Sequence, residues 1–506
     1  MALNCFISHR MASSSIVVFA EFPSGSRVIT EDDLSSDEGH PTESRTDDEL
    51  TFELMPRGSS KGNDVLLSSD GHTYTINGRS SVSTYWICSK SRGSKCKARV
   101  RTTNGNHFPS GPGHNHNANV DENNVRKLIR DCKEAGTSNL FASASNVVED
   151  VLNESRNELM SVENLPTVNE LVRKTNRKRS ACRPQEPQDK DFEIDQDFVE
   201  GFLKADVHTD SRRILLFANE NQMRVLYKAK RWYCDGTFRV VKDPFYQLFT
   251  VHAFVKKEGN IKQVPLMFIF MTGKSKRDYR VAFQAIKDLL QPDNEGPQEF
   301  VIDYEAAIWG AIRSVFPNST IKCCSYHYAQ AIYRKIQDVG LQKDYVESFL
   351  TKMFCKQLMA LIYLPPAAMA EQFNILSYQI HGNQKLQLLF DYVYNTWMTS
   401  ENWSTDEINV YEQPIRSNND VEGWHRRLNS KAKQSISFYS LISLLQSEAD
   451  MVEFNIKYLK QGSHIRIQRS GHLELQRTFF ALWDFYKAGD LSSNDMLIEF
   501  AKLIKQ

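Results

Sequence analysis

The sequence has little of what marks a secreted or membrane-embedded chain. Its 506 residues contain no long apolar run, and stretches such as Val264 to Met271 are far shorter than the roughly 20 residues that cross a bilayer. The short run from Ile16 to Ala20 follows no basic cluster, so it does not resemble a signal peptide. We therefore expect a chain without a membrane partner or a secretory leader.

Cysteine is scattered and charge is balanced. The nine cysteines form no regular framework and are odd in number, which argues against a disulfide-stabilised fold and favours a reducing compartment. Lys and Arg total 62, as do Asp and Glu, so the net charge gives no sign of a nucleic-acid partner. Any contact with DNA must then come from local basic patches, and each cysteine is first interpreted as a metal ligand or a core residue.

Length and changes of composition predict several segments. A chain of 506 residues is too long for one ordinary domain. Residues 1–62 are rich in Ser, Gly and acidic residues, which predicts a disordered acidic tail. The other expected segments are a small strand-rich domain at 63–120, a helical and basic linker at 121–195, a main domain at 196–435 and a helical region at 436–506.

The main domain has an informative order of elements. Periodicity and turn residues predict three strands joined by hairpins, at 231–238, 246–255 and 264–272. Residues 343–415 are mostly helical, and a further helix starts near Asn419. Between them we expect a helix at 278–290, a strand at 299–303, a helix at 306–316, a strand at 320–324 and a helix at 328–337. This is the order of an RNase H-like α/β domain with a helical insertion.

Two cysteines and two histidines lie close together in the strand-rich segment. Cys88 and Cys96 flank Gly93, and a Gly-Pro-Gly turn precedes His114 and His116. Thiolate and imidazole groups paired at short turns are the usual ligands of a structural zinc ion, which would stabilise a domain with so small a core. The alternative is that the cysteines are core thiols and the histidines lie exposed in a loop.

The same segment resembles the FLYWCH zinc-finger family. The resemblance rests on Tyr74, Tyr85-Trp86-Ile87-Cys88, Cys96-Lys97-Ala98-Arg99 and His114-Asn115-His116. It implies a zinc-binding β-sheet with a DNA-binding or protein-binding role. The segment is also basic, which suits contact with phosphates, although a mixed solvated face is the alternative. Its basic residues are Lys90, Arg92, Lys95, Lys97, Arg99 and Arg101.

Three acidic residues of the main domain occupy positions suited to metal chemistry. Asp235 interrupts a strand-like run, where an ionised group is costly to bury without a partner. Asp303 ends an apolar strand, and Glu422 follows an N-cap at Asn418 or Asn419, in the first turn of a helix. Phosphodiester cleavage with two divalent ions needs a few such carboxylates. Taken singly, each acid is also consistent with a turn residue or a helix N-terminal acid.

The motifs around these acids resemble the transposase domain of Mutator-like elements. They are Asp235-Gly236-Thr237-Phe238, Phe245-Tyr246-Gln247-Leu248, Val251-His252-Ala253, Val264-Pro265-Leu266, Asp303-Tyr304-Glu305, Cys324-Ser325-Tyr326-His327 and the run from Asn418 to His425. The resemblance implies a catalytic set of Asp235, Asp303 and Glu422 that binds Mg²⁺ or Mn²⁺, cuts DNA and joins it to a target.

Four neighbouring residues leave more than one interpretation. Glu305 could support the metal ligands or replace one of them, or it could simply begin the next helix. Cys324 and His327 match a Cys-x-x-His element of the family, and we expect them to have a structural or supporting role. A metal site would need two more ligands, with Cys323, Cys234 and His425 as candidates. His425 shares a helix face with Glu422, so it could reach the scissile phosphate.

Three hypotheses for the function remain open. The first is an active transposase that binds double-stranded DNA at the element ends and at the target. The second is a domesticated DNA-binding transcription or chromatin factor that no longer transposes, and the third is a decayed copy that folds poorly. Because two DNA ends must be held together, we expect a homo-oligomer. The basic stretch from Arg173 to Arg179 predicts a nuclear localisation signal, with a solvated linker as the alternative.

Overall fold

The computed structural model describes ten ranges of the chain. They are residues 50–59, 62–159, 162–209, 211–257, 260–290, 293–380, 382–416, 418–432, 436–461 and 470–504. The chain divides into two units, Met1–Lys127 with Glu158–Leu165 and Leu128–Asn157 with Pro166–Gln506. Most of the expected acidic tail, residues 1–49 and 60–61, lies outside the described residues.

The first unit contains a six-stranded antiparallel sheet with the strands in sequence order. Strands form here because apolar and polar residues alternate, which places Leu66, Trp86 and Val100 on one buried face. The strands are β1 (Phe52–Met55), β2 (Val65–Ser68), β3 (Thr73–Arg79), β4 (Ser83–Cys88), β5 (Arg99–Thr103) and β6 (Asn106–Ser110).

Strand β1 corrects one expectation. Residues 1–62 were expected to form a disordered tail, but Phe52–Met55 pairs with β2, and Met55 is buried. The prediction was wrong for this stretch because it weighed the acidic composition and missed a short apolar run at the end of the tail. Strand β1 therefore extends the sheet beyond the predicted boundary at residue 63.

Helices follow the sheet in the described part of the segment 121–195, which was expected to be helical and basic. They are α1 (Val120–Ser138), α2 (Ala144–Glu154), α3 (Arg156–Leu159) and α4 (Val168–Ser180). Arg179 of α4 is buried and donates hydrogen bonds of 2.9, 2.7 and 2.9 Å to the carbonyl oxygens of Gly136, Asn139 and Ala142. These carbonyls lie at or after the end of α1, where helical oxygens lack partners. One residue of the basic stretch is thus structural, while Arg173, Lys174, Arg177 and Lys178 are exposed.

The second unit is built on a seven-stranded mixed sheet in the order β13-β12-β9-β10-β11-β8-β7. Strands β9, β10 and β11 are antiparallel neighbours, and β12 and β13 run parallel to β9. The strands are β7 (Leu203–Thr209), β8 (Arg212–Phe217), β9 (Arg231–Thr237), β10 (Gln247–Lys257), β11 (Asn260–Met271), β12 (Glu299–Ile302) and β13 (Thr320–Cys323). The predicted strands are confirmed, whereas β7 and β8, followed by the short helix α5 (Glu220–Leu226), were not anticipated.

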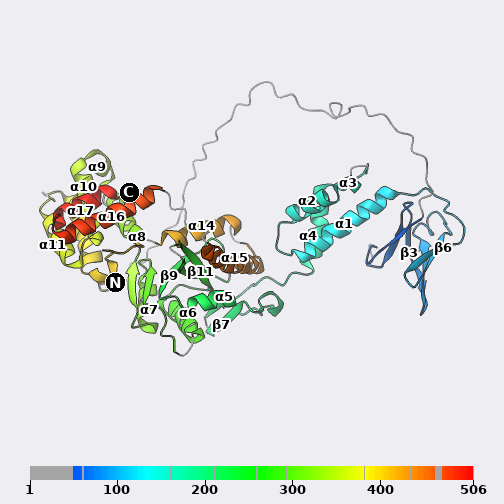
Figure 1. Cartoon of the computed structure of the whole chain (residues 1–506), viewed down its shortest axis with the longest axis horizontal. Helices are drawn as coiled ribbons and strands as arrows, with labels where there is room; N and C mark the ends of the chain where they lie inside the picture. Colours follow the sequence, from blue (N-terminus) through cyan, green and yellow to red (C-terminus); the bar gives the residue numbers. More distant parts are fainter. Residues whose placement is uncertain are drawn as a thin grey trace, which may run out of the picture. The chain divides into compact units, whose positions relative to one another are not determined.

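Helices cover both faces of this sheet (Figure 1). Alternate strand residues such as Trp232 and Phe249 pack against α6 (Lys276–Leu289) and α7 (Ala306–Val315). Leu248 and Phe268 point to the opposite face, against α14 (Asn419–Ala432) and α15 (Phe438–Lys460). Because both faces are dry, a polar side chain within these strands needs a partner or a strand end.

The remaining helices share one hydrophobic core with the face of the sheet that α6 and α7 cover. They are α8 (Ser325–Asp338), α9 (Gln342–Glu347), α10 (Phe349–Ala360), α11 (Pro366–Ser377), α12 (Gln384–Val393), α13 (Thr405–Ile408), α16 (Ser470–Ala488) and α17 (Ser493–Leu503). Trp483 of α16 is buried and donates a 2.9 Å hydrogen bond to the Tyr363 carbonyl, so the C-terminal helices brace the insertion. Among the described residues, no helix is long and apolar enough to span a membrane.

A buried carboxylate joins α14 to α15. Glu448 is 5 % exposed and accepts hydrogen bonds from Trp424 Nε1 at 3.0 Å, from Lys431 Nζ at 2.7 Å and from the guanidinium of Arg427. Its replacement by alanine leaves the Trp424 donor buried and unpaired. We therefore expect Glu448→Ala to lower the free energy of unfolding by about 2 kcal/mol, measured by urea denaturation. The exposed Glu453→Ala on the same helix should change it by less than about 0.5 kcal/mol, and equal losses would contradict this role.

Candidate functional site

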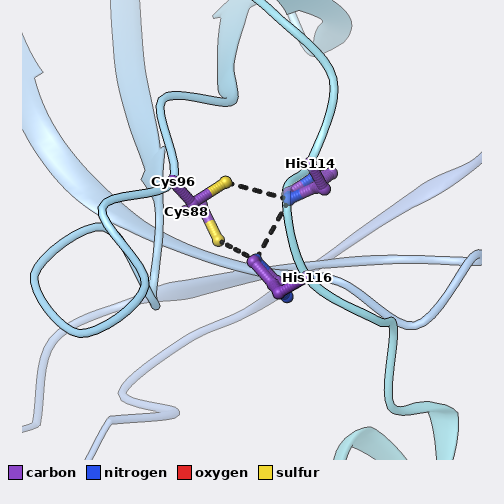
Figure 2. Close-up of side chains that lie close together, drawn as sticks. All are labelled: Cys88, Cys96, His114 and His116. Atoms are coloured by element: carbon purple, nitrogen blue, oxygen red, sulfur yellow. Dashed lines mark hydrogen bonds between the residues drawn. The ribbon is translucent and has the colours of Figure 1, made fainter.

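Cys88, Cys96, His114 and His116 converge at one end of the six-stranded sheet (Figure 2). Cys88 ends β4, Cys96 lies in the following loop, and both histidines follow β6. Cys88 Sγ lies 3.2 Å from His116 Nε2, Cys96 Sγ lies 3.4 Å from His114 Nδ1, and those two nitrogens are 3.4 Å apart. Zn–S bonds near 2.3 Å and Zn–N bonds near 2.0 Å give tetrahedral edges of about 3.3–3.6 Å, so the four donors fit a zinc ion.

A tyrosine side chain and a backbone carbonyl hold the two histidines in the required orientation. Tyr74 Oη lies 2.8 Å from His114 Nε2, and the Asn117 carbonyl lies 3.0 Å from His116 Nδ1. Each contact occupies one ring nitrogen and leaves the other to face the cysteines, as is usual around a metal. The ring of His72 stacks on His114 with centroids 3.5 Å apart. Tyr74 was part of the family resemblance, whereas the contact made by His72 was not predicted from the sequence.

Burial has opposite effects on the two kinds of ligand. It raises the pKa of the Cys88 thiol to about 11 and lowers the pKa of His114, to which the nearby rings of His72 and His116 add. Without metal the thiol therefore keeps its proton, whereas His114 is neutral. Because zinc binds the thiolate, metal uptake must release a proton and weakens as the pH falls.

The three acids of the second unit come from neighbouring elements. Asp235 lies on β9, Asp303 directly follows β12, and Glu422 lies in the first turn of α14. Tyr233 and Val301 are paired in the parallel ladder, so Asp235 and Asp303 each lie two residues beyond a matched pair. Val421 packs on that same pair, which holds the start of α14 over this end of the sheet. The register thus brings the acids together at the carboxyl ends of β9 and β12.

Their electrostatics suit a cation. Burial raises the pKa values of Asp303 and Glu422 above their usual range, and the charge of Asp235 adds to both shifts, while His327 opposes them. Within the described ranges, Asp303 Oδ1 and Glu422 Oε1 are buried oxygens without a hydrogen-bond partner. Buried, repelling carboxylates whose oxygens lack hydrogen bonds are the donor set that a divalent ion such as Mg²⁺ or Mn²⁺ takes.

His327 lies between two of the acids. Its Nδ1 is 2.8 Å from Asp303 Oδ1, without hydrogen-bond geometry, and its Nε2 is 3.4 Å from Glu422 Oε1. Burial lowers the pKa of His327, but the close contacts with Asp303 and Cys324 and their charges outweigh it and raise the pKa to about 11. Asp303, Cys324 and His327 each offer a donor atom within 4.8 Å of the others. Cys324 and His327 thus lie next to the acids through Asp303. The extra ligands suggested by the sequence, Cys323, Cys234 and His425, are not part of this group.

The ring of His425 contacts the Asp235 carboxylate. Its Nδ1 lies 3.0 Å from Asp235 Oδ2, and its Nε2 lies 3.0 Å from Thr250 Oγ1. His252 Nε2 lies 3.0 Å from the same hydroxyl, and burial lowers the pKa of His252 well below the usual value. His425 is only 5 % exposed, and its contact with Asp235 orients that carboxylate. Thr250 and His252 were missed, although polar residues inside the buried strand β10 were a usable signal.

Glu305 and Asn418 complete the surroundings. Glu305 is the N-cap residue of α7 without a side-chain cap bond, and its Oε2 lies 3.4 Å from Tyr279 Oη. It is therefore adjacent to the acids, in the helix-starting position that was one of its two interpretations. Asn418 is fully buried and donates from Nδ2 to the Cys234 carbonyl at 3.2 Å. This bond ties the start of α14 to β9 and sets the position of Glu422.

A cavity of about 700 Å³ opens beside Asp235 and Glu422. Its wall includes two arginines and several polar groups, so it is suited to an anionic polymer more than to an apolar ligand. The lining residues are Asp235, Gly236, Thr237, Arg239, Glu422, His425, Arg426, Asn429 and Ser430.

The structure thus combines a small β-sheet module that carries a Cys/His cluster with an α/β domain that carries three neighbouring acids. Comparison with protein families identifies both. Residues 58–116 match the FLYWCH zinc finger domain, and residues 231–331 match the MULE transposase domain. The first match includes all four proposed zinc ligands, whereas the second includes Asp235 and Asp303 but ends before Glu422. No curated protein matches the chain. The chain thus carries a FLYWCH zinc finger and a transposase-family domain.

Proposed function

We propose that this chain is a DNA transposase of the Mutator-like type with an RNase H-like core, and that Asp235, Asp303 and Glu422 bind its divalent metal ions. The observation that carries the proposal is the convergence of the three acids from β9, the end of β12 and α14. The strand order β13-β12-β9-β10-β11, with three antiparallel strands followed by two parallel ones, supports the RNase H-like assignment. So does the transposase-family match at residues 231–331.

The chain's own residues have distinct roles in the proposed reaction. Mg²⁺ or Mn²⁺ supplies activation of the attacking hydroxyl and stabilisation of the leaving oxygen. Asp303 and Glu422 would bind metal through the oxygens that lack hydrogen bonds, and His425 keeps Asp235 in one orientation. His327 offsets the negative charge of the cluster before metal binds. Arg239 and Arg426 in the adjoining cavity hold backbone phosphates.

We also propose that one face of the zinc-finger sheet contacts DNA. Tyr85, Arg101 and Phe108 form a row across β4, β5 and β6. The two rings are 44 % and 46 % exposed, and the Arg101 guanidinium lies 5.8 Å from the Phe108 centroid. Arg99 lies on the same exposed face of β5. Exposed aromatic rings combined with arginines suit contact with nucleic acid.

Arg99→Ala combined with Arg101→Ala tests this face. If each arginine neutralises one phosphate, the salt dependence of DNA binding, as log Kd against log salt, should fall by about 1.8 units of slope. Fluorescence anisotropy over a salt series measures this. Lys343→Ala, which removes an exposed charge on α9, serves as the control. An unchanged slope in the double variant would place the DNA contact elsewhere.

The proposal extends to partners and location. Double-stranded DNA at the element ends and target is the expected partner, and joining two ends calls for a homo-oligomer. The exposed basic residues of α4 support a nuclear location. The proposed segments are the finger at 63–120, now extended by β1, a linker at 121–195, the catalytic domain at 196–435 and C-terminal helices at 436–506.

The function is tested by cleavage of DNA. The purified full chain is incubated with a fragment carrying the inverted repeats that flank its coding region, with Mg²⁺, Mn²⁺ or EDTA. We expect metal-dependent nicks at the repeat ends and, with target DNA present, joined products on denaturing gels. Binding without any cleavage in either metal would instead identify a domesticated DNA-binding protein.

A further inference from the structure

Two aromatic side chains and a lysine lie exposed beyond the acidic cluster. Phe238 directly follows β9 and Tyr246 directly precedes β10, and they are 47 % and 48 % exposed. Their rings are edge-to-face with centroids 5.3 Å apart, and Lys274 Nζ lies 5.4 and 5.6 Å from the two centroids. The rings and the ammonium group thus form a small preorganised surface, which we call the aromatic platform.

The platform does not belong to the core. The neighbouring Thr237 and Gln247 are buried and make contacts inside the domain, with Asn429 and Tyr279 respectively. Phe238 and Tyr246 instead leave about half of each side chain in water, which is unfavourable for aromatic rings. Two adjacent rings exposed in this way mark a surface that binds another molecule.

The platform adjoins the acids. Phe238 lies three residues after Asp235, which corresponds to roughly 10 Å along an extended chain. Lys274 is close enough to Glu305, the N-cap residue of α7, for its charge to act on that carboxylate. Glu305 in turn feels the charges of Asp303 and Asp235. A molecule bound to the platform would therefore extend to a position beside the proposed metal ligands.

The charge around the platform indicates the kind of molecule. The segments 238–246 and 272–277 contain five basic residues and one acidic residue, Asp243. Arg239 also lines the cavity that contains Asp235 and Glu422. Rings with a lysine over them, on segments rich in basic residues, suit stacked bases with phosphates alongside, whereas the centre of a protein contact is depleted of charge. The basic residues are Arg239, Lys242, Lys274, Lys276 and Arg277.

We propose that Phe238 and Tyr246, together with Lys274, bind one unpaired base of the DNA strand whose phosphodiester lies at the acids. This inference rests on the proposed function. A ring can stack on the face of a base only when that base has left the duplex. Holding such a base on the platform would keep the strand open and place its phosphate next to Asp235.

Photocrosslinking tests the contact directly. The full chain in EDTA is mixed with a forked duplex carrying 5-iodouracil in its single-stranded arm, or with a blunt duplex carrying it internally. After irradiation, mass spectrometry should locate the crosslink on peptides containing Phe238 or Tyr246 for the fork and not for the blunt duplex. Crosslinks that map only to other parts of the chain would overturn the proposal.

Affinity provides a second measurement. Phe238→Ala combined with Tyr246→Ala should weaken binding of the fork about tenfold or more, and change binding of the blunt duplex less than about twofold. Tyr246→Phe keeps the ring and should bind like wild type, as should Tyr378→Ala, which removes an exposed ring at the end of α11.

Equal affinity of wild type and the double variant for the fork, or an altered mass in light scattering with affinity unchanged, would overturn the platform. Because binding is measured without metal, these results are independent of cleavage. Failure to cut DNA would contradict the proposed transposase activity, while the base contact could still be measured.

Discussion

Replacing Asp303 with asparagine is expected to slow metal-dependent DNA cleavage by about 10³-fold or more. The amide has nearly the same shape but no charge, so it loses most of its attraction for a divalent ion. Asp303 Oδ1 has no hydrogen-bond partner in the described part of the chain, so its main interactions are electrostatic. The substitution therefore separates loss of metal binding from loss of protein contacts.

The stability of this variant should change little. Asparagine ends the repulsion of Asp303 by Asp235, but it also ends the attraction between Asp303 and His327. Because these effects oppose each other, we expect the Tm in EDTA to shift by only a few degrees. Cleavage is followed on denaturing gels and Tm by calorimetry. Asp338→Asn on α8, whose side chain is 70 % exposed, should cut at the wild-type rate. Equal nicking by Asp303→Asn and wild type would rule out the proposed metal site.

Removing a zinc ligand is expected to unfold the six-stranded sheet. The buried core of this sheet is small, so the metal supplies much of its stability. Structural zinc contributes on the order of 10 kcal/mol in small fingers, as much as the whole stability of many domains. We therefore expect Cys88→Ser to lose zinc and the strand signal of the sheet, with the second unit still folded.

Metal analysis of the purified chain and circular dichroism test this. Cys182→Ser removes an exposed cysteine and should retain both zinc and the sheet. Acidification should release the metal from wild type, because burial raises the pKa of Cys88 to about 11 and protons then compete for the thiolate. A protein purified without metal, with the same melting in Cys88→Ser, would contradict the zinc centre.

Local patterns in the sequence predicted most elements of the fold. A strand was predicted at 299–303, because a short apolar run ending on an acid has one common interpretation, and β12 occupies Glu299–Ile302. Edge strands were harder. Strands β7 and β8 were missed because their residues mix charge with apolar runs, and their role depends on pairing with β11.

The proposed sites were predictable to different degrees. The four proposed zinc ligands were predicted from the two cysteines and two histidines at turns together with the family resemblance, and the structure brings them together. The residues that contact the three acids were not predicted in this way. Thr250 contacts His425, which is far along the chain, and its only local signal was a polar residue inside a buried strand.

The sequence by itself therefore determined the order of the elements and the chemistry of the ligands, because both depend on residues near one another in the chain. Only the tertiary structure decided which oxygens face each other. His425 meets Asp235 across 190 residues of sequence, a contact set by the register of β12 against β9 and the seating of α14 on that pair. Side-chain packing between distant segments fixes both, which makes the acidic cluster a property of the folded domain.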